Sequence, residues 1–111
     1  MKDKTISELT RDVRASFAKY DAQGTRHWTW QTAAADLPYQ VGSLSKVILQ
    51  MSGDRYAEGK TEYELKWQLR NELADIMAEV LYVAAEFDID MNQAMAEMVD
   101  DDTKKVGERT K

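Results

Sequence analysis

The acidic residues between positions 72 and 86 have the types and spacing most suited to chemistry. Glu72, Asp75, Glu79 and Glu86 fall within about 60° of one another on a helical wheel. Carboxylates three residues apart on a helix project to one side and can share a hard divalent cation. Mg²⁺ takes one or two such ligands and fills its other positions with water and phosphate oxygens. The spacing therefore indicates a magnesium site that acts on a phosphorylated substrate.

The alternative is an ordinary solvated acidic face, which is the commoner arrangement for isolated Glu and Asp pairs. Lys66 and Arg70 lie upstream as available ion-pair partners. Glu72 and Glu79, however, border the apolar arc of the helix, beside Val83. An ionised carboxylate is costly at such a border. Its placement there favours the metal site.

Two tryptophans form a second group of interest. Trp28 and Trp30 lie in a segment without clear periodicity, residues 21–35, which we expect to be a loop. An indole face can stack on any nucleobase, so the pair can form a base platform. The alternative is a hydrophobic plug that folds over the helices. We assign no role to the neighbouring His27.

The elements that must position these groups are all helices, because the apolar residues recur every three or four positions and no run alternates. We expect helices over residues 6–20, 36–52, 61–87 and from about 91. The first, third and fourth have capping pairs, and the second has an N-cap followed by a first-turn proline. These signals are Thr5 with Glu8, Thr61 with Glu64, Asp90 with Gln93, and Asp36 with Pro38. The charged segment from Asp100, including a tail over about residues 103–111, is expected to fray.

The stripe of the second helix and the wide arc of the third bear on assembly. The second helix carries Leu37, Val41, Leu44, Ile48 and Met51 as its apolar stripe. The third helix would be roughly 40 Å long, whereas a compact chain of this size has a radius of gyration near 13 Å. We therefore expect one end of it to overhang, with Trp67 and Leu81. Because one partner helix cannot cover the arc, the sequence predicts a homodimer or homotetramer.

Composition excludes several other classes of protein. The 111 residues fit a single domain, residues 1–111, with 43% hydrophobic and 32% charged residues. A net charge of −5 argues against a nucleic-acid partner, since phosphate neutralisation needs a basic surface. The chain has no cysteine and one histidine, which excludes disulfides and makes a zinc site unfavourable. No apolar run suits a membrane span or signal peptide, so we expect no membrane partner and a cytoplasmic location.

From Leu37 to Arg109 the chain resembles the MazG-like, all-α nucleoside triphosphate pyrophosphohydrolases. The segment from Asn71 to Ile76 is similar to the family's helix-borne ExxD motif, formed here by Glu72 and Asp75. Residues 87–94 resemble its turn into a last helix. The segment Asp102-Thr103-Lys104-Lys105 with Arg109 resembles its basic C-terminal motif. The resemblance implies an all-α, four-helix bundle completed by oligomerisation.

The chain departs from this family at the earlier ExxE motif. The family has Glu-Glu-x-Gly-Glu-Leu where this chain has Tyr39-Gln40-Val41-Gly42-Ser43-Leu44. Gln40 and Ser43 therefore replace both glutamates of the motif. Gln40 can offer a neutral carbonyl oxygen to the metal, and Glu79 lies one turn beyond Asp75 as partial compensation. We expect weaker metal binding or a rearranged site.

Three functions follow from these patterns. The first is Mg²⁺-dependent hydrolysis of a nucleoside triphosphate to the monophosphate and pyrophosphate, as in the house-cleaning of nucleotides. The metal ligands would be Glu72, Asp75 and Gln40, and Glu79 would be a further ligand or the base that orients water. Phosphate contacts would come from Lys46, Arg55 and Lys104 or Arg109, and the base contact from Trp30. The second function is a non-catalytic relative that binds a nucleotide or a protein, and the third is a plain helical interaction module.

Overall fold

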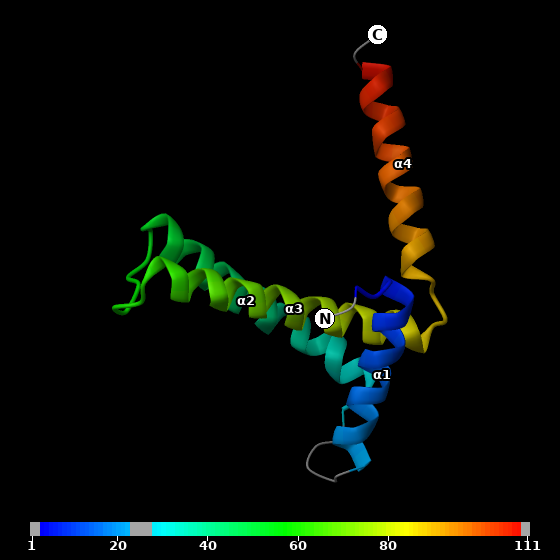
Figure 1. Ribbon diagram of the computed structural model, residues 1–111, viewed down its shortest axis with the longest axis horizontal. Helices are drawn as coiled ribbons and strands as arrows, with labels where there is room; N and C mark the ends of the chain where they lie inside the picture. Colours follow the sequence, from blue (N-terminus) through cyan, green and yellow to red (C-terminus); the bar gives the residue numbers. More distant parts are fainter. Residues whose placement is uncertain (1–2, 23–27, 110–111) are drawn as a thin grey trace.

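The computed structural model describes residues 3–22 and 28–109 of the chain, and all regular structure in these two ranges is helical (Figure 1). No strand occurs in either range. The expected all-α class is therefore confirmed. The four helices are α1 Ile6–Ala22, α2 Trp30–Ser52, α3 Glu62–Glu86 and α4 Met91–Arg109.

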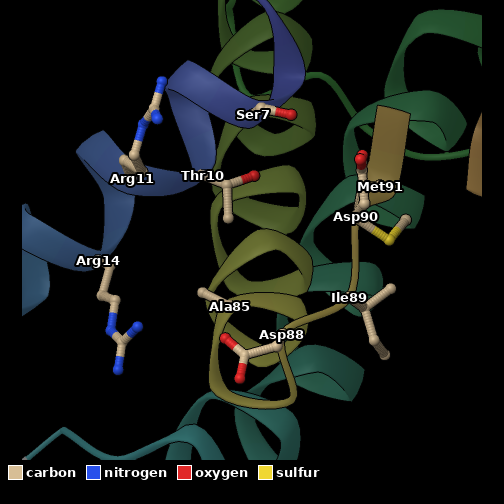
Figure 2. Close-up of a pocket in the computed structure, with 9 residues that line it drawn as sticks. All are labelled: Ser7, Thr10, Arg11, Arg14, Ala85, Asp88, Ile89, Asp90 and Met91. Atoms are coloured by element: carbon tan, nitrogen blue, oxygen red, sulfur yellow. The ribbon is translucent and has the colours of Figure 1, made fainter. Parts of the chain in front are cut away.

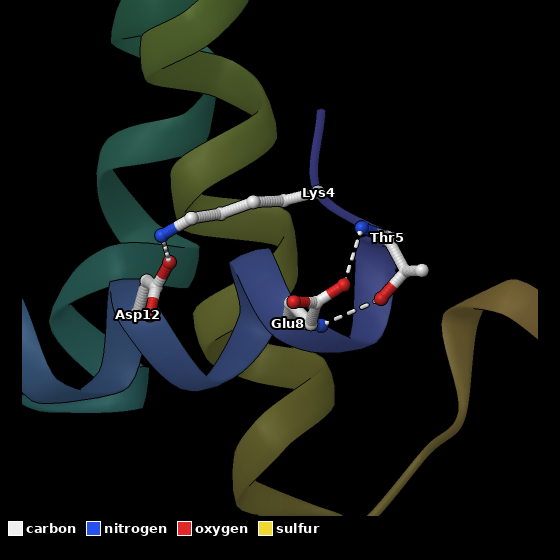
Figure 3. Close-up of polar contacts among 4 residues, drawn as sticks. All are labelled: Lys4, Thr5, Glu8 and Asp12. Atoms are coloured by element: carbon white, nitrogen blue, oxygen red, sulfur yellow. Dashed lines mark hydrogen bonds and ion pairs between the residues drawn. The ribbon is translucent and has the colours of Figure 1, made fainter. Parts of the chain in front are cut away.

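The start of α1 follows the capping box expected from the sequence. The Thr5 hydroxyl accepts from the Glu8 backbone N–H, and a Glu8 carboxylate oxygen accepts from the Thr5 backbone N–H, each at 3.1 Å (Figure 3). The Thr5 backbone N–H lowers the pKa of Glu8 because it stabilises the carboxylate. Lys4 forms an ion pair with Asp12 across the same turns. These contacts fix where α1 begins.

The beginning of α2 differs from the sequence prediction. The helix starts at Trp30, with Thr29 as its N-cap, and the Thr29 hydroxyl accepts from the Thr32 backbone N–H at 3.2 Å. Asp36 is therefore not the N-cap, and Pro38 lies inside the helix rather than in its first turn. The run of alanines from Ala33 explains the difference, since alanine is the strongest helix former and extends the helix upstream of the proline. Of the expected loop over residues 21–35, residues 23–27, including His27, lie outside the described ranges.

The end of α2 and the starts of α3 and α4 follow local signals in the sequence. Gly53 ends α2 with a φ of 84°, a conformation that glycine adopts freely. Thr61 and Glu64 form the expected capping box of α3, and the Asp90 carboxylate accepts from the Gln93 N–H at the start of α4. The expected fraying from Asp100 is wrong, because α4 continues to Arg109. Ion pairs of Asp100 with Lys104 and Asp101 with Lys105, each four residues apart, support its last turns.

The helices are arranged as a long hairpin with a crossing helix and an arm. α2 and α3 lie antiparallel, α1 crosses the end of the hairpin near the C-terminus of α3, and α4 leads away from that corner (Figure 1). The buried apolar side chains are few: Ala33, Val47, Leu65, Leu81 and Ala84. The radius of gyration is 17.4 Å, compared with about 13 Å for a compact chain of this length. Leu81 and Trp67 were both expected on an overhanging end of α3. Leu81 is instead buried within one copy, whereas Trp67 is exposed.

Among the described residues, no helix combines the length and the apolar character needed to cross a bilayer.

Candidate functional site

The buried carboxyl group of Glu79 is the most unusual group in the structure. Glu79 is only 4% exposed, and its Oε2 atom is buried without a hydrogen-bond partner. Burial, then a side-chain hydrogen bond with Asp36, and then the charges of Asp36 and Asp75 raise the pKa of Glu79 to about 7. An acid in such surroundings keeps its proton until near neutral pH, because ionisation would add a second charge to a poorly solvated place. It is therefore suited to proton transfer.

Asp36 and Gln40, one turn apart on α2, complete the surroundings of Glu79. The Gln40 Nε2 amide donates to Asp36 Oδ2 at 3.1 Å, which leaves the Gln40 carbonyl oxygen available as an acceptor or ligand. Asp36, expected as an N-cap, is instead a member of the site. Asp36, Gln40 and Ser43 recur at helical spacing on the face turned to α3. That periodicity would have identified Asp36 if the start of α2 had been placed at Trp30.

The other predicted acidic residues differ in exposure. Glu72 is half-buried, whereas Asp75 and Glu86 are exposed. Within the two described ranges, no cluster of three or more Asp, Glu or His side chains has the geometry to hold a metal ion. Two carboxylates and an amide oxygen nevertheless suit Mg²⁺, which keeps several waters and needs few protein ligands. Glu72, Asp75 and Gln40 would supply these three groups. Asp75 and Glu72 precede Glu79 on α3 by about one and two turns, so the Glu79 Oε2 atom, which has no hydrogen-bond partner, lies beside them.

The predicted phosphate-binding residues are spread along the molecule. Lys46 lies roughly one turn beyond Glu72 toward the hairpin connection, in the register set by Asp36 and Glu79, and it pairs with Glu58 at 3.5 Å. Arg55 is exposed in that connection. Lys104 pairs with Asp100 on α4, which leads away from the hairpin. Of these three predicted residues, Lys46 is the one that the helix register places nearest to Glu72.

The tryptophans pack at the opposite end of the hairpin. Trp30 is half-buried and meets Phe87 edge-on, with ring centroids 5.0 Å apart. Trp28 stacks with Phe17 at 6.0 Å, and the Tyr82 hydroxyl donates to the Trp28 backbone carbonyl at 3.1 Å. These contacts support the plug interpretation for Trp28. The base-platform interpretation of Trp30 stays a prediction, since the contact described for its ring is the packing against Phe87.

A separate cavity of about 310 Å³ lies between α1 and the corner that joins α3 to α4. Figure 2 shows Arg11 and Arg14 on its α1 side and Asp88 on the opposite side. Its other polar groups join the elements: the Asn92 side chain donates to the Ser7 hydroxyl at 2.6 Å, and Asp90 caps α4. We interpret this cavity as a structural junction rather than a site.

Comparisons of the chain with protein families, with curated proteins and with solved structures find no match. The function must therefore be inferred from the residues themselves.

Proposed function

We propose that the chain is a Mg²⁺-dependent nucleoside triphosphate pyrophosphohydrolase, which converts a nucleoside triphosphate and water to the monophosphate and pyrophosphate. The observation that carries this proposal is the buried Glu79 carboxyl group beside Asp36. A general base works best when its pKa lies near the working pH, and burial places Glu79 there. The MazG-like motif at Glu72 and Asp75 supports the same chemistry.

The residues have distinct roles in this proposal. Glu72, Asp75 and the Gln40 carbonyl hold Mg²⁺, which when bound neutralises phosphate charge and lowers the pKa of a water. Glu79 orients the attacking water and accepts its proton. Asp36 accepts from the Gln40 amide and, through its hydrogen bond with Glu79 and then its charge, adds to the effect of burial in raising the pKa of Glu79.

Substrate contacts come from residues outside the carboxylate group. Lys46 is the phosphate contact nearest to Glu72, and Arg55 and Lys104 are the more distant ones. Trp30 contacts the base by stacking. A homodimer or homotetramer is the assembly that we propose for the enzyme.

Pyrophosphate release over a panel of nucleotides, measured during a Mg²⁺ titration, tests the activity. We expect Glu72→Ala and Asp75→Ala to abolish metal-dependent release with helicity unchanged. Glu86→Ala is the matched control, because Glu86 is an exposed carboxylate on the same helix outside the proposed ligand set. Parent-like hydrolysis by both site variants would show that the metal assignment is wrong.

Restoring the missing carboxylates tests the same site in the opposite direction. Gln40 and Ser43 lie on the α2 face turned to α3, so Gln40→Glu with Ser43→Glu adds two anionic ligands there. We expect tighter Mg²⁺ binding, measured by calorimetry. An unchanged affinity would place the metal elsewhere.

A non-catalytic relative that binds nucleotides or a partner protein is the second candidate. It is favoured by the neutral residues at 40 and 43 and by the lack, within the described ranges, of a three-carboxylate cluster. Saturable nucleotide binding by the parent chain without pyrophosphate release would favour this function over hydrolysis.

A further inference from the structure

Helix α3 packs on two sides. Buried Leu65 and Glu79 lie on the side that α2 covers. Buried Leu81 and Ala84 lie nearly opposite them on the helical wheel, where α1 crosses α3 near its C-terminus (Figure 1). The side that α1 covers at this end continues along α3 toward the hairpin connection, where Trp67 is exposed.

Four residues near the start of α3 form this exposed continuation: Tyr63, Lys66, Trp67 and Arg70. They recur every three or four positions, so they lie on the side of the helix that carries Leu81 further along. Together they line a shallow groove of about 280 Å³. Tyr63 is 75% exposed and Trp67 is 52% exposed. We call these four residues the Trp67 patch.

The Trp67 patch combines two aromatic rings with two cations. The Arg70 guanidinium lies over the Trp67 ring, 4.5 Å from its centroid, and its Nη1 atom donates to Asn71 Oδ1 at 3.1 Å. Within the two described ranges, neither Lys66 nor Arg70 forms an ion pair. By contrast, Lys46 is paired with Glu58. The cations of the patch therefore lack carboxylate partners in the described part of the chain.

The residue types of the patch indicate a protein partner, and its charge indicates an acidic one. Tyr, Trp and Arg are the residue types that contribute most binding energy at protein interfaces. A cation gains most from a carboxylate when apolar groups beside it exclude water. The nearest acids on α3, Glu62 and Glu64, lie about a quarter-turn from the patch on either side, and Glu64 is engaged in the Thr61 capping box. A partner must therefore supply the carboxylates.

The spacing within the patch suits a helical partner. Lys66 and Arg70 are four residues apart, as are Tyr63 and Trp67, so each pair is separated by about 6 Å along the axis. Two acids four residues apart on a second helix, beside two apolar residues with the same spacing, would match both pairs. The side of α3 that carries the patch also packs against a helix at its other end, where α1 crosses it.

We propose that the Trp67 patch binds an acidic amphipathic helix of a partner protein, with apolar side chains on Tyr63 and Trp67 and carboxylates on Lys66 and Arg70. This inference goes beyond hydrolysis and does not rest on it. The patch lies near the hairpin connection, whereas Glu79 lies near the corner that joins α3 to α4.

Fluorescence anisotropy of a labelled helical peptide tests the proposal. The probe, which we call the Glu probe, carries two leucines four residues apart and, beside them, two glutamates four residues apart. A matched Lys probe has lysines in place of the glutamates. We expect the chain to bind the Glu probe saturably, with weaker binding as salt increases, and to bind the Lys probe at least about tenfold more weakly. No saturable binding of the Glu probe, or equal binding of both, would overturn the proposal.

Variants of the patch locate the binding surface. We expect Trp67→Ala to weaken binding of the Glu probe by on the order of tenfold or more, with helical circular dichroism retained. Tyr39→Ala is the matched control, since Tyr39 is an exposed aromatic residue on α2. Lys66→Glu with Arg70→Glu should reverse the preference, so that the Lys probe binds better, and this result stands even if Trp67→Ala fails to fold. Parent-like binding of the Glu probe by all these variants would show that the patch is not the surface.

A second copy of the chain is the other occupant that the experiment must distinguish. We expect the parent and Trp67→Ala to sediment alike. If Trp67→Ala alone converts an oligomeric parent to a monomer, a second copy covers the patch, and the proposal of a separate partner is overturned. None of these measurements follows pyrophosphate release, so failure of the patch would leave the hydrolysis proposal untouched.

Discussion

The two halves of the seam between α2 and α3 bury different polar groups. Toward the hairpin connection it buries Val47, Leu65 and the neutral side chain of Gln50, whose Nε2 amide donates to the Tyr56 backbone carbonyl at 3.1 Å. Toward the corner it buries the carboxyl group of Glu79 beside Asp36. Buried apolar groups stabilise a fold at every pH, whereas a buried acid destabilises it at the pH where the acid ionises. The polar group buried near the connection is thus neutral at every pH, whereas the stability of the corner half depends on whether Glu79 is ionised.

Truncating a buried apolar side chain near the hairpin connection should have the largest effect on stability. Leu65→Ala removes a buried side chain and leaves a cavity, so we expect a loss of about 2–5 kcal/mol in the free energy of unfolding. Urea denaturation followed by circular dichroism measures it. The loss should not depend on pH between 4 and 8. A loss below about 0.5 kcal/mol, the size typical of a surface substitution, would mean that this half is not the stabilising one.

The half of the seam that contains Glu79 should instead control how stability depends on pH. The pKa of Glu79 rises from 4.5 when unfolded to about 7 when folded, so the folded state holds the extra proton between these values. The free energy of unfolding should therefore fall as pH rises from about 4.5 to about 7, by up to about 3 kcal/mol. Glu79→Gln cannot ionise and should lack this decline.

Denaturation of parent and Glu79→Gln at matched pH values separates this effect from other titrating groups. Asp75→Asn is the control, because Asp75 is exposed and should leave most of the decline in place. The same slope in the parent and in Glu79→Gln would contradict the assignment of the decline to Glu79.

Replacing Trp30, at the corner end of the hairpin, should have a smaller effect on stability than replacing Leu65. It is half-buried against Phe87, so we expect Trp30→Ala to cost about 1–2 kcal/mol, less than truncating a fully buried aromatic residue. If Trp30 also stacks on the base, nucleotide affinity of the folded protein should weaken roughly 5- to 150-fold, the equivalent of about 1–3 kcal/mol.

Thermal melting and fluorescence titration on the same variant distinguish the two roles. Trp67→Ala is the control, because Trp67 is 52% exposed, with the Arg70 guanidinium 4.5 Å from its ring centroid. A melting loss in Trp30→Ala with unchanged affinity would leave Trp30 as a packing residue alone.

The sequence predicted those features that depend on near neighbours. The Thr5 and Thr61 capping boxes are confirmed, since each needs only residues three positions apart. The predicted start of α2 was wrong because Pro38 was interpreted as a first-turn signal. The preceding alanines favour helix and extend α2 upstream of the proline. Placing a carboxylate at an apolar border correctly marked Glu79 as unusual.

The partner of Glu79 was not predictable, because it depends on how two helices meet. The pairing with Asp36 follows from the register of α2 against α3. The same register explains why the apolar stripe of α2 is half-exposed at Val41 and Ile48. Periodicity identifies an apolar face but not which neighbour covers it.

Pro38 inside α2 has a consequence for motion. Proline has no backbone N–H, so the Ala34 carbonyl lacks its partner four residues on. The first turns of α2, which carry Asp36, are therefore joined to the rest by one hydrogen bond fewer. Amides of residues 31–37 should exchange with deuterium faster than those of 41–50, as a separate opening unit. The half of the seam that carries the acid would thus be the half able to open and close without unfolding the protein.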